Sequence, residues 1–468
     1  MKRNILLDTD SYKLSHFKQY PPGTTNVTSY IEARGGDFSE SVFFGLQAWI
    51  KANLLTPITE ADVEEYEAIG SAHGLPVNPK DMRYIIAEHG GYLPLEIRAV
   101  AEGSVVPINN VLVQVENTDE RLLWLTSYME TSLLRSVWYP TTVATLSREA
   151  KKRIYQGLML TSDDPEGQIP FKLHDFGARG ASSEETAALG GMAHLVNFMG
   201  TDTLSGILAA RRFYGADMPG FSIPASEHST MTTWGRDGES AAFKNMLTQF
   251  GGEGKLVACV SDSYDIFAAV DELWGDELRE AVQSTGGTLV VRPDSGDPVK
   301  IPIEVVERLM AKFGHETNSK GYRVLPASVR VIQGDGMSLE NIVRVVTTME
   351  ERGLSIDNIA FGMGGGLLQK VDRDTMKFAM KANAVKINGQ WQDVYKDPIT
   401  DQGKRSKRGR LGLINQCGIG TCDYRTVPAD IFYDEVDPRA NLLVPVYRNG
   451  ELLVEHTFDE VRERAAVA

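Results

Sequence analysis

Residues 358–370, NIAFGMGGGLLQK, show the pattern on which the fold prediction rests. The strand-forming residues 359–361 end in four glycines, Gly362, Gly364, Gly365 and Gly366, and a segment that could open a helix follows. So many residues without side chains indicate that something lies close to this backbone. Backbone N–H groups at such a turn can bind an anion, helped by the start of the next helix. A tight turn without a ligand is the alternative.

The glycines match neither of two familiar phosphate-binding fingerprints. Leu367 stands where the third glycine of a dinucleotide-binding GxGxxG would be. Residues 252–256, GEGKL, lack both the upstream glycine and the Ser or Thr of a Walker A motif.

The same pattern of a short apolar run followed by polar residues or glycines recurs along the middle of the chain. Starts of successive runs lie roughly 23 to 41 residues apart, which fits repeated βα units. Residues 303–314 and 338–353 between them carry apolar residues at helical spacing and end in glycine. The runs begin the segments 171–180, 194–203, 221–230, 255–265, 288–298, 329–336 and 358–366.

Seven such units predict an α/β protein with an irregular (β/α) barrel-like domain over residues 166–374. A doubly wound open sheet is the alternative, and both folds bind ligands at the carboxyl ends of their strands. Residues 1–165 and 375–468 mix helices and strands, which predicts a second, mixed α+β domain built from both chain ends.

The predicted strand ends are rich in charged residues, which a barrel core does not require because buried charges are costly unless paired. Helix capping is an alternative for Ser222, Ser261 and Asp335. Carboxylates interleaved with arginines suit a magnesium polyphosphate, since Asp holds the cation and Arg binds phosphate oxygens. The charged residues are Asp175, Arg179, Asp202, Glu227, His228, Asp262, Asp265, Arg292, Asp294 and Asp335.

The basic run and His228 can each be interpreted either as functional or as purely structural. Residues 396–410 form the one dense basic run, read either as a solvated loop or as a phosphate-binding flap. His228 directly follows Glu227, and no second histidine stands four residues on to make a zinc motif. A structural histidine is the alternative to acid–base work or capture of a phosphoryl group by the imidazole.

Composition excludes several classes of function. The net charge of −15 disfavours nucleic acid or an anionic membrane surface as the main partner. Cys259, Cys417 and Cys422 give neither a disulfide framework nor a paired zinc pattern. The apolar run after the basic N-terminus is too short for a signal peptide, and no run approaches a membrane span of about 20 residues. We therefore expect a cytoplasmic protein.

From residues 4–22 (NILLDTDSYKLSHFKQYPP) to residues 404–410 (KRSKRGR), the sequence resembles the nicotinamide phosphoribosyltransferases, a type II phosphoribosyltransferase family. The shared segments, in order, are HDFGARG, HLVNFMGTDT, SEHST, VSDSYDI, RPDSG, VIQGDG and GGGLLQK. The resemblance implies transfer of phosphoribose from phosphoribosyl pyrophosphate to nicotinamide in NAD salvage, giving nicotinamide mononucleotide and pyrophosphate. It also implies stimulation by ATP through a phosphohistidine.

The resemblance also implies roles for particular residues. His228 would be phosphorylated by ATP, and Asp262 and Asp294 would hold Mg²⁺ and ribose beside Arg292. Phe176 would stack on the pyridine ring, opposite Tyr12 of a second subunit in a homodimer with shared active sites. Asp202 and Arg179 would bind the carboxamide, although Arg179 could reach a phosphate instead. The remaining substrate-binding residues would be Asp10, Arg34, Gly334, Asp335, Gly364, Gly365, Arg373, Lys381, Lys396 and Lys404.

Two departures from vertebrate members, Ala178 for tyrosine and Met363 for serine, lie beside binding positions and bear on the shape of the pocket. Three other functions compete with this reading. Nicotinate phosphoribosyltransferase shares the architecture, but Asp202 would repel the acid. A non-enzymatic signalling or scaffold protein could keep the fold, and a generic phosphate-binding isomerase or aldolase would need a lysine or base that does not stand out.

Overall fold

The computed structural model describes residues 4–400, 405–418, 421–429 and 440–467. The chain forms two compact units, which we call the sheet unit (residues 1–145, 212–216 and 372–465) and the barrel unit (residues 146–211, 217–371 and 466–468). The long helix α5 (Glu130–Thr161) contributes residues to both. The boundary predicted at residue 165 lies beyond the C-terminus of this helix.

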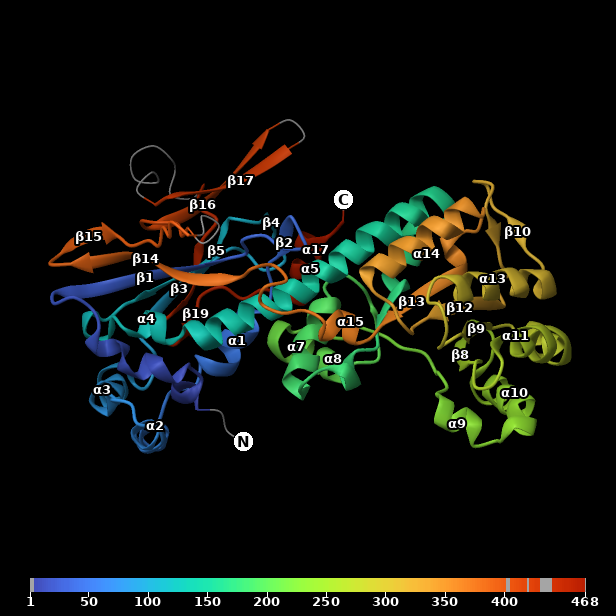
Figure 1. The fold of residues 1–468 in the computed structure, drawn as a ribbon, viewed down its shortest axis with the longest axis horizontal. Coiled ribbons are helices and arrows are strands. Elements are labelled where there is room, and N and C mark those ends of the chain that lie inside the picture. Colours follow the sequence, from blue (N-terminus) through green and yellow to red (C-terminus); the bar gives the residue numbers. More distant parts are fainter. Residues whose placement is uncertain (1–3, 401–404, 419–420, 430–439, 468) are drawn as a thin grey trace. The chain divides into compact units, whose positions relative to one another are not determined.

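The sheet unit is built on a seven-stranded antiparallel sheet in the order β15-β14-β1-β5-β3-β18-β19. Both ends of the chain contribute to this sheet, because β1 near the N-terminus pairs with β14 in the C-terminal part of the chain, with Thr24 opposite Ile387 (Figure 1). The strands are β1 Thr24–Glu32, β3 Leu95–Ala99, β5 Val111–Asn117, β14 Ala379–Ile387, β15 Gln390–Asp393, β18 Val444–Arg448 and β19 Glu451–Leu452. Two small sheets accompany it: β2 Glu40–Val42 with β4 Val105–Pro107, and β16 Leu411–Gly418 with β17 Thr421–Pro428.

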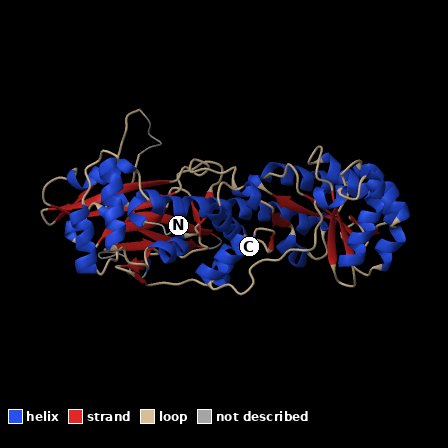
Figure 2. Ribbon diagram, turned by 90° about the horizontal axis from the view of Figure 1, so that it is seen from below, coloured by secondary structure: helices blue, strands red, loops and turns tan. Residues whose placement is uncertain are grey.

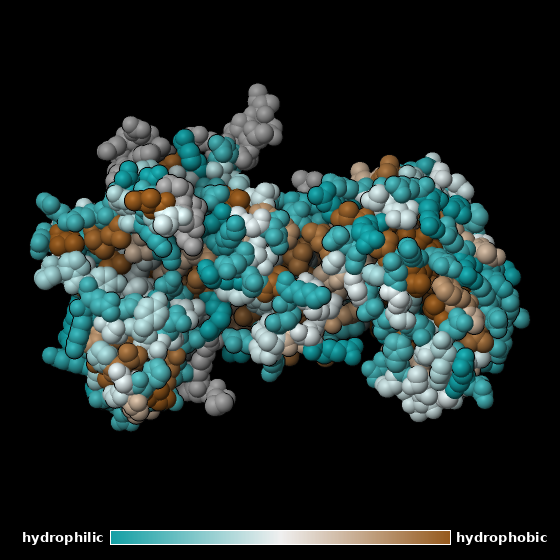
Figure 3. Space-filling model, viewed as in Figure 1, coloured by the Kyte–Doolittle hydropathy of each residue, from teal (hydrophilic) through white to brown (hydrophobic). Residues whose placement is uncertain are grey.

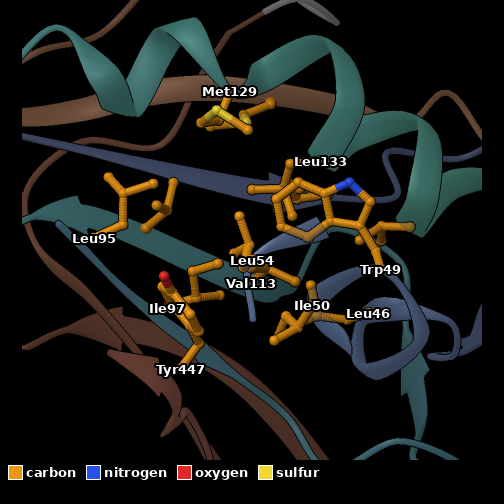
Figure 4. Close-up of a cluster of buried hydrophobic side chains, with 14 of the residues drawn as sticks. Leu46, Trp49, Ile50, Leu54, Leu95, Ile97, Val113, Met129, Leu133 and Tyr447 are labelled. Carbon is orange, nitrogen blue, oxygen red and sulfur yellow. The ribbon is translucent and has the colours of Figure 1, made fainter. Parts of the chain in front are cut away.

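Helices cover one face of the large sheet (Figure 1) and bury their apolar stripes against it. Figure 4 shows Leu46 and Ile50 of α1, and Leu54 directly after it, near Ile97 and Val113 of the sheet, all of them buried. The helical elements of this unit are η1 Ile5–Leu7, η2 Ser11–Lys18, α1 Leu46–Asn53, α2 Glu60–Ala72, α3 Pro79–His89, η3 Glu120–Leu122, α4 Leu125–Tyr128 and α17 Phe458–Ala465.

The barrel unit contains a six-stranded, entirely parallel sheet in the order β7-β6-β13-β12-β9-β8. Helices lie around these strands (Figure 2), while strand residues such as Ala258, Val290 and Ile332 pack together in a separate small cluster. The strands are β6 Leu173–Asp175, β7 Gly200–Thr201, β8 Leu256–Val260, β9 Thr288–Arg292, β12 Val329–Gln333 and β13 Ile359–Met363, and the hairpin β10 Glu316–Thr317 with β11 Arg323–Val324 lies outside the sheet.

The connecting helices follow the predicted apolar spacing. Helix α13 (Lys300–Phe313) buries Ile303, Val306 and Met310, and Gly314 follows it with φ +80°. Helix α14 (Leu339–Glu351) likewise buries apolar residues at intervals of three and four. The other helical elements are α6 Pro165–Gln168, η4 Ile169–Phe171, η5 Ala178–Gly180, α7 Glu184–His194, α8 Leu204–Tyr214, α9 His228–Thr232, η6 Arg236–Gly238, α10 Glu239–Phe250, α11 Ile266–Ala268, the π-helix η7 Ala269–Glu277, α12 Arg279–Ser284, η8 Ile356–Asn358 and α15 Gly365–Leu368.

The predicted α/β class, with a curled parallel sheet and a separate antiparallel sheet, is confirmed, but one predicted strand is wrong. Residues 221–230 do not form a strand; Phe221 bridges Gly200 at one edge of the parallel sheet and Ala225 bridges Ala258 at the other. This segment therefore links both edges of the curled sheet. Pro224 has no N–H to donate, which prevents a continuous ladder there.

The hydropathy of the surface and of the helices bears on what a membrane span requires. Hydrophilic residues predominate on the face shown in Figure 3. Among the helices in the described ranges, none is long and apolar enough to cross a bilayer.

Candidate active site

The six parallel strands have their carboxyl ends on the same side of the sheet, so the residues that follow the strands are brought together there. We call this side the carboxyl edge of the sheet. Phe176 follows β6, Asp202 follows β7, and Asp262 follows β8. Arg292 ends β9, Gly334 follows β12, and Gly364 follows β13. His228 does not follow a strand as predicted: it begins helix α9, after the segment that joins the two sheet edges.

A cavity of about 520 Å³ opens inside the curled sheet. Small residues on its wall, such as Ala258 and Ala360, leave this space where larger side chains would fill a barrel. Phe176 and Asp202 both line it, together with Arg292. A flat aromatic side chain and a carboxylate therefore share one mostly apolar pocket, which suits a planar polar ring.

The glycines that follow β13 have two different structural reasons. A Cβ on Gly362 would lie 2.0 Å from Cε2 of Phe176, and one on Gly366 would lie 2.9 Å from the carbonyl oxygen of Met337. Protein packing thus requires those two glycines. A Cβ on Gly364 would make only ordinary contact, and one on Gly365 would meet nothing within 4 Å. A side chain would therefore find open space at Gly365 and would fit without overlap at Gly364.

The Phe176 ring is held from several sides. Its backbone N–H donates to the carbonyl of Met363 at 3.0 Å, and the absence of side chains at Gly362 and Gly334 lets the ring lie against both strand ends. Asp175 just before it is fully buried and accepts a 2.7 Å hydrogen bond from the Gly177 N–H. Burial raises the pKa of Asp175 to about 6. Asp175 therefore stabilises the turn after β6 and is not among the residues that line the cavity.

His228 lies between two carboxylates. Its Nε2 is 2.8 Å from Oδ1 of Asp262, and its Nδ1 is 3.8 Å from Oδ2 of Asp294. The Asp262 side chain is only 4% exposed, whereas the imidazole is 45% exposed. One ring nitrogen is thereby oriented by a buried carboxylate while the ring stays accessible to a reactant.

Arg292 and Asp335 add to this charge cluster. The guanidinium of Arg292 is 3.5 Å from Oδ2 of Asp294. Burial raises the pKa of Asp294; Arg292 opposes this shift, and the negative charges of Asp262 and Asp335 add to it. Mutual repulsion among three carboxylates would be relieved by a divalent cation.

The carboxylates fit magnesium by their chemistry. Mg²⁺ prefers hard oxygen ligands and is usually held by one or two carboxylates together with water and substrate phosphates. Within the described ranges, no group of three or more His, Cys, Asp or Glu side chains is arranged to hold a metal unaided. Asp262 and Asp294 are therefore candidates for a magnesium ion that a polyphosphate substrate completes.

Sequence reasoning missed two serines that orient site carboxylates. The Ser295 hydroxyl donates to Oδ2 of Asp262, and the Ser222 hydroxyl donates to Oδ1 of Asp202. Ser295 stands next to Asp294 in the PDSG segment, which was the available signal. Ser222 and the other two suggested caps, Ser261 and Asp335, begin no helix; Asp265 caps α11 and Ser338 caps α14.

Other predicted residues lie in the sheet unit. Arg34, Arg373 and Lys381 are close enough to influence each other: burial lowers the pKa of Lys381, Glu130 opposes the shift, and both arginines increase it. The Tyr12 side chain is 59% exposed. The Asp10 carboxylate accepts from the Thr131 hydroxyl at 2.6 Å.

Three further predicted positions lie outside these clusters. Arg179 lies exposed in the turn after Phe176, and the Lys396 backbone pairs with Ser406 in the basic segment. Lys404 lies outside the described residues. Of the two departures, Met363 is fully buried beneath Gly366 while Ala178 is exposed.

The fold and the strand-end residues define a phosphoribosyltransferase of the barrel-containing type. Residues 171–449, more than half of the chain, match the model of the nicotinate phosphoribosyltransferase (NAPRTase) family, and residues 4–97 match the nicotinamide phosphoribosyltransferase N-terminal domain. The chain belongs to this family, on the nicotinamide phosphoribosyltransferase side, and is a pentosyltransferase.

Two relatives support this assignment, and two solved structures share the fold. Nicotinamide phosphoribosyltransferase of Xanthomonas campestris pv. campestris is 53% identical over 99% of this chain and 98% of its own, and that of Acinetobacter baylyi is 33% identical over 99% and 97%. The fold is similar to nicotinate-nucleotide pyrophosphorylase from Pyrococcus furiosus, with a TM-score of 0.64 at 18% identity over 99% of this chain and 95% of that one. Human nicotinic acid phosphoribosyltransferase gives a TM-score of 0.52 at 17% identity, over 98% and 92%.

Proposed function

We propose that the chain transfers phosphoribose from phosphoribosyl pyrophosphate to nicotinamide, releasing pyrophosphate, as a step of NAD salvage. The observation that carries the proposal is that Phe176, Asp202 and Arg292, which lie at the carboxyl ends of the parallel strands, line one cavity inside the curled sheet. The reaction needs a planar ring held against the anomeric carbon and a leaving group whose charge is neutralised. Both requirements have matching groups at the carboxyl edge.

The ring half of the site consists of Phe176, Asp202 and Arg179. Phe176 stacks on one face of the pyridine ring, and the Asp202 carboxylate accepts a hydrogen bond from the carboxamide NH2. Arg179 binds the carboxamide oxygen or a phosphate. Nicotinate, the substrate of the nearest alternative function, would place a second carboxylate opposite Asp202 and be repelled.

The phosphate half consists of the remaining strand ends. Asp262 and Asp294 hold Mg²⁺, which neutralises the pyrophosphate, while Arg292, Gly334 and Asp335 contact the ribose or pyrophosphate. The amides of Gly364 and Gly365 bind the 5′-phosphate. The open space at Gly365 supports this assignment, and protein packing does not require a glycine at Gly364 either.

A pair of glycine variants tests the phosphate assignment. Gly365→Ala should shift the melting temperature by less than about 2 °C, because its Cβ meets nothing, yet raise KM for phosphoribosyl pyrophosphate by about tenfold or more. Gly362→Ala should instead destabilise the fold, because its Cβ overlaps the Phe176 ring. Thermal melts and initial rates measure both. An unchanged KM in Gly365→Ala would remove this residue from the phosphate site.

We propose that ATP phosphorylates His228 and that hydrolysis of the phosphohistidine drives synthesis forward without being an obligatory step. The accessible imidazole, oriented by buried Asp262, supports this. His228→Ala should abolish ATP hydrolysis and lower nucleotide synthesis without eliminating it, whereas the matched surface variant His315→Ala should change neither. ATPase activity that survives in His228→Ala would show that another residue accepts the phosphate.

We propose a homodimer in which the sheet unit of one subunit completes the site of the other. Exposed Tyr12 would stack on the second face of the nicotinamide ring. Arg34, Arg373 and Lys381, which lie near one another, would bind phosphates with Lys396. Asp10 and Lys404 complete the proposed set, and the proposed compartment is the cytoplasm.

The direct test is release of pyrophosphate from purified protein mixed with nicotinamide, phosphoribosyl pyrophosphate and Mg²⁺, with and without ATP. Pyrophosphate should appear only when nicotinamide is present, and in equal amount to nicotinamide mononucleotide. No release under these conditions would favour the non-enzymatic alternative. Efficient release with nicotinate instead would favour nicotinate phosphoribosyltransferase.

A further inference from the structure

A buried carboxylate, Glu32, joins two cations at the end of strand β1 in the sheet unit. Its Oε1 accepts from Nε of Arg34 at 2.8 Å and from the Tyr30 hydroxyl at 3.2 Å. Its Oε2 pairs with Nζ of Lys407. The Glu32 side chain is 3% exposed, so water contributes little to these interactions.

Tyr30, two residues before Glu32, holds the backbone of the same lysine. The Lys407 N–H donates to the Tyr30 hydroxyl at 2.8 Å, and the Lys407 ammonium lies 5.9 Å from the centroid of the Tyr30 ring. Burial and the Glu32 charge raise the pKa of Tyr30 to about 12. The hydroxyl therefore stays protonated near neutral pH and can accept from Lys407 while donating to Glu32.

The anchored lysine belongs to the basic segment of residues 396–410. Its neighbour Ser406 is buried and exchanges two hydrogen bonds with Lys396: the Lys396 N–H donates to the Ser406 hydroxyl at 2.8 Å, and the Ser406 N–H donates to the Lys396 carbonyl at 2.9 Å. By contrast, the Arg405 and Arg408 side chains are each 60% exposed. Lys407 thus attaches this segment to β1, and Ser406 joins it to Lys396 within the same segment. Gly409 attaches it to β14 as well, because its N–H donates to the Asn383 carbonyl at 2.8 Å and its carbonyl accepts from the Asn383 side chain at 2.7 Å.

Stability alone does not explain a buried ion pair of this kind. Taking a carboxylate and an ammonium out of water is costly, and apolar residues of similar size often stabilise a core equally well. The arrangement has a different consequence, since one carboxylate fixes the positions of Arg34 and Lys407 relative to each other. These cations come from chain segments more than 370 residues apart.

We propose that Glu32 is a positioning residue for polyphosphate binding. It holds the Arg34 guanidinium directly, so that this cation meets the substrate already ordered. Through Lys407 and Ser406 it also fixes the backbone of Lys396, the position from which that exposed side chain reaches the substrate. Ordering flexible cations before binding lowers the entropic cost of binding. The inference rests on the proposed function where it assigns Arg34 and Lys396 to phosphates; the anchoring of the basic segment does not depend on it.

The same sheet contains a matched control. Glu96 of strand β3 accepts from Nε of Arg98, two residues on, at 2.6 Å, and from Nε of Arg448 at 2.7 Å. This carboxylate also joins an i+2 arginine to a cation from a distant segment. Its partners lie outside residues 396–410, so loss of its charge should leave the basic segment attached.

Limited trypsin digestion measures the attachment without reference to activity. Mass spectrometry follows cleavage after Arg405, Lys407 and Arg408. We expect this cleavage to be about tenfold faster in Glu32→Gln than in the wild type, because local opening of the segment becomes easier. Glu96→Gln should be cleaved there at the wild-type rate. Tyr30→Phe, which removes only the hydroxyl that accepts from Lys407, should accelerate cleavage too and serves if Glu32→Gln does not fold.

Steady-state kinetics then measure the consequence for the substrate. In Glu32→Gln, KM for phosphoribosyl pyrophosphate should rise about tenfold while kcat changes by less than about threefold, and KM for nicotinamide should be unchanged. Unchanged cleavage in both Glu32→Gln and Tyr30→Phe overturns the proposal. Faster cleavage with an unchanged KM overturns its positioning part. If the wild type forms no nucleotide, the proposed function fails, and the digestion still decides the attachment.

Discussion

Asp294→Asn is expected to lower kcat/KM for phosphoribosyl pyrophosphate by about a hundredfold to a thousandfold. Asp294 lies 3.8 Å from His228 and 3.5 Å from Arg292, and its pKa is raised chiefly by burial, with a further contribution from neighbouring carboxylates. Removing its charge weakens the proposed Mg²⁺ site and leaves the pyrophosphate less well neutralised. Initial rates of pyrophosphate release across a magnesium titration measure the loss.

Asp297→Asn provides the control within the same loop. The Asp297 carboxylate accepts from the N–H groups of Val299 and Lys300, at the start of helix α13. This variant should lose about 1 kcal/mol of stability at most and keep its activity. Equal losses of activity in both variants would indicate damage to the loop rather than to a metal site.

Mixing inactive subunits extends this test to the proposed dimer. Tyr12→Ala and Asp294→Asn affect opposite halves of the proposed shared site. Random reassembly of equal amounts should restore about a quarter of wild-type activity, because half of the dimers are mixed and each mixed dimer has one intact site. Absence of recovery after verified subunit exchange would mean that each chain contains its whole active site.

Asp202→Ser is expected to have the second largest effect, on the choice between nicotinamide and nicotinate. In the wild type, the carboxylate of Asp202 should favour the amide by about a hundredfold or more in kcat/KM, because it would face a second carboxylate in nicotinate. Serine removes that repulsion and should reduce the preference by about tenfold or more. Parallel assays with both substrates measure the ratio.

Ser222→Ala is the control for this substitution. It removes the hydroxyl that donates to Asp202 but keeps the charge, so the preference for nicotinamide should persist. Comparable kcat/KM values for the two substrates in the wild type would contradict the role given to Asp202. A preference that survives unchanged in Asp202→Ser would assign discrimination to another residue.

Periodicity predicted the regular parts of the barrel unit well. Helices α13 and α14 bury the apolar residues that the spacing indicated, and six of the seven predicted segments contain a strand. In residues 194–203 the apolar run follows the end of helix α7 as a turn, and only Gly200–Thr201 pair as a strand. The strand predicted in residues 221–230 was wrong, because an apolar run in the sequence does not reveal whether its backbone has a continuous hydrogen-bonding partner. Here the pairing is split between two sheet edges around Pro224.

The strand-end rule brought most of the predicted barrel residues to one edge, but the sequence could not separate their structural and functional reasons. The run of glycines shows this most directly. Gly362 is required by the ring of Phe176, which lies almost two hundred residues earlier, whereas Gly365 has open space around it. Only the three-dimensional fold distinguishes these neighbours, and the serines that orient Asp202 and Asp262 depend on the same tertiary contacts.

The most direct test of the central claim is a crystal structure of the protein with nicotinamide mononucleotide. We predict that the pyridine ring lies on Phe176 with its carboxamide at hydrogen-bonding distance from Asp202, and that the phosphate is bound by the amides of Gly364 and Gly365. A mononucleotide bound away from this edge of the parallel sheet would contradict the proposed site and the mechanism built on it.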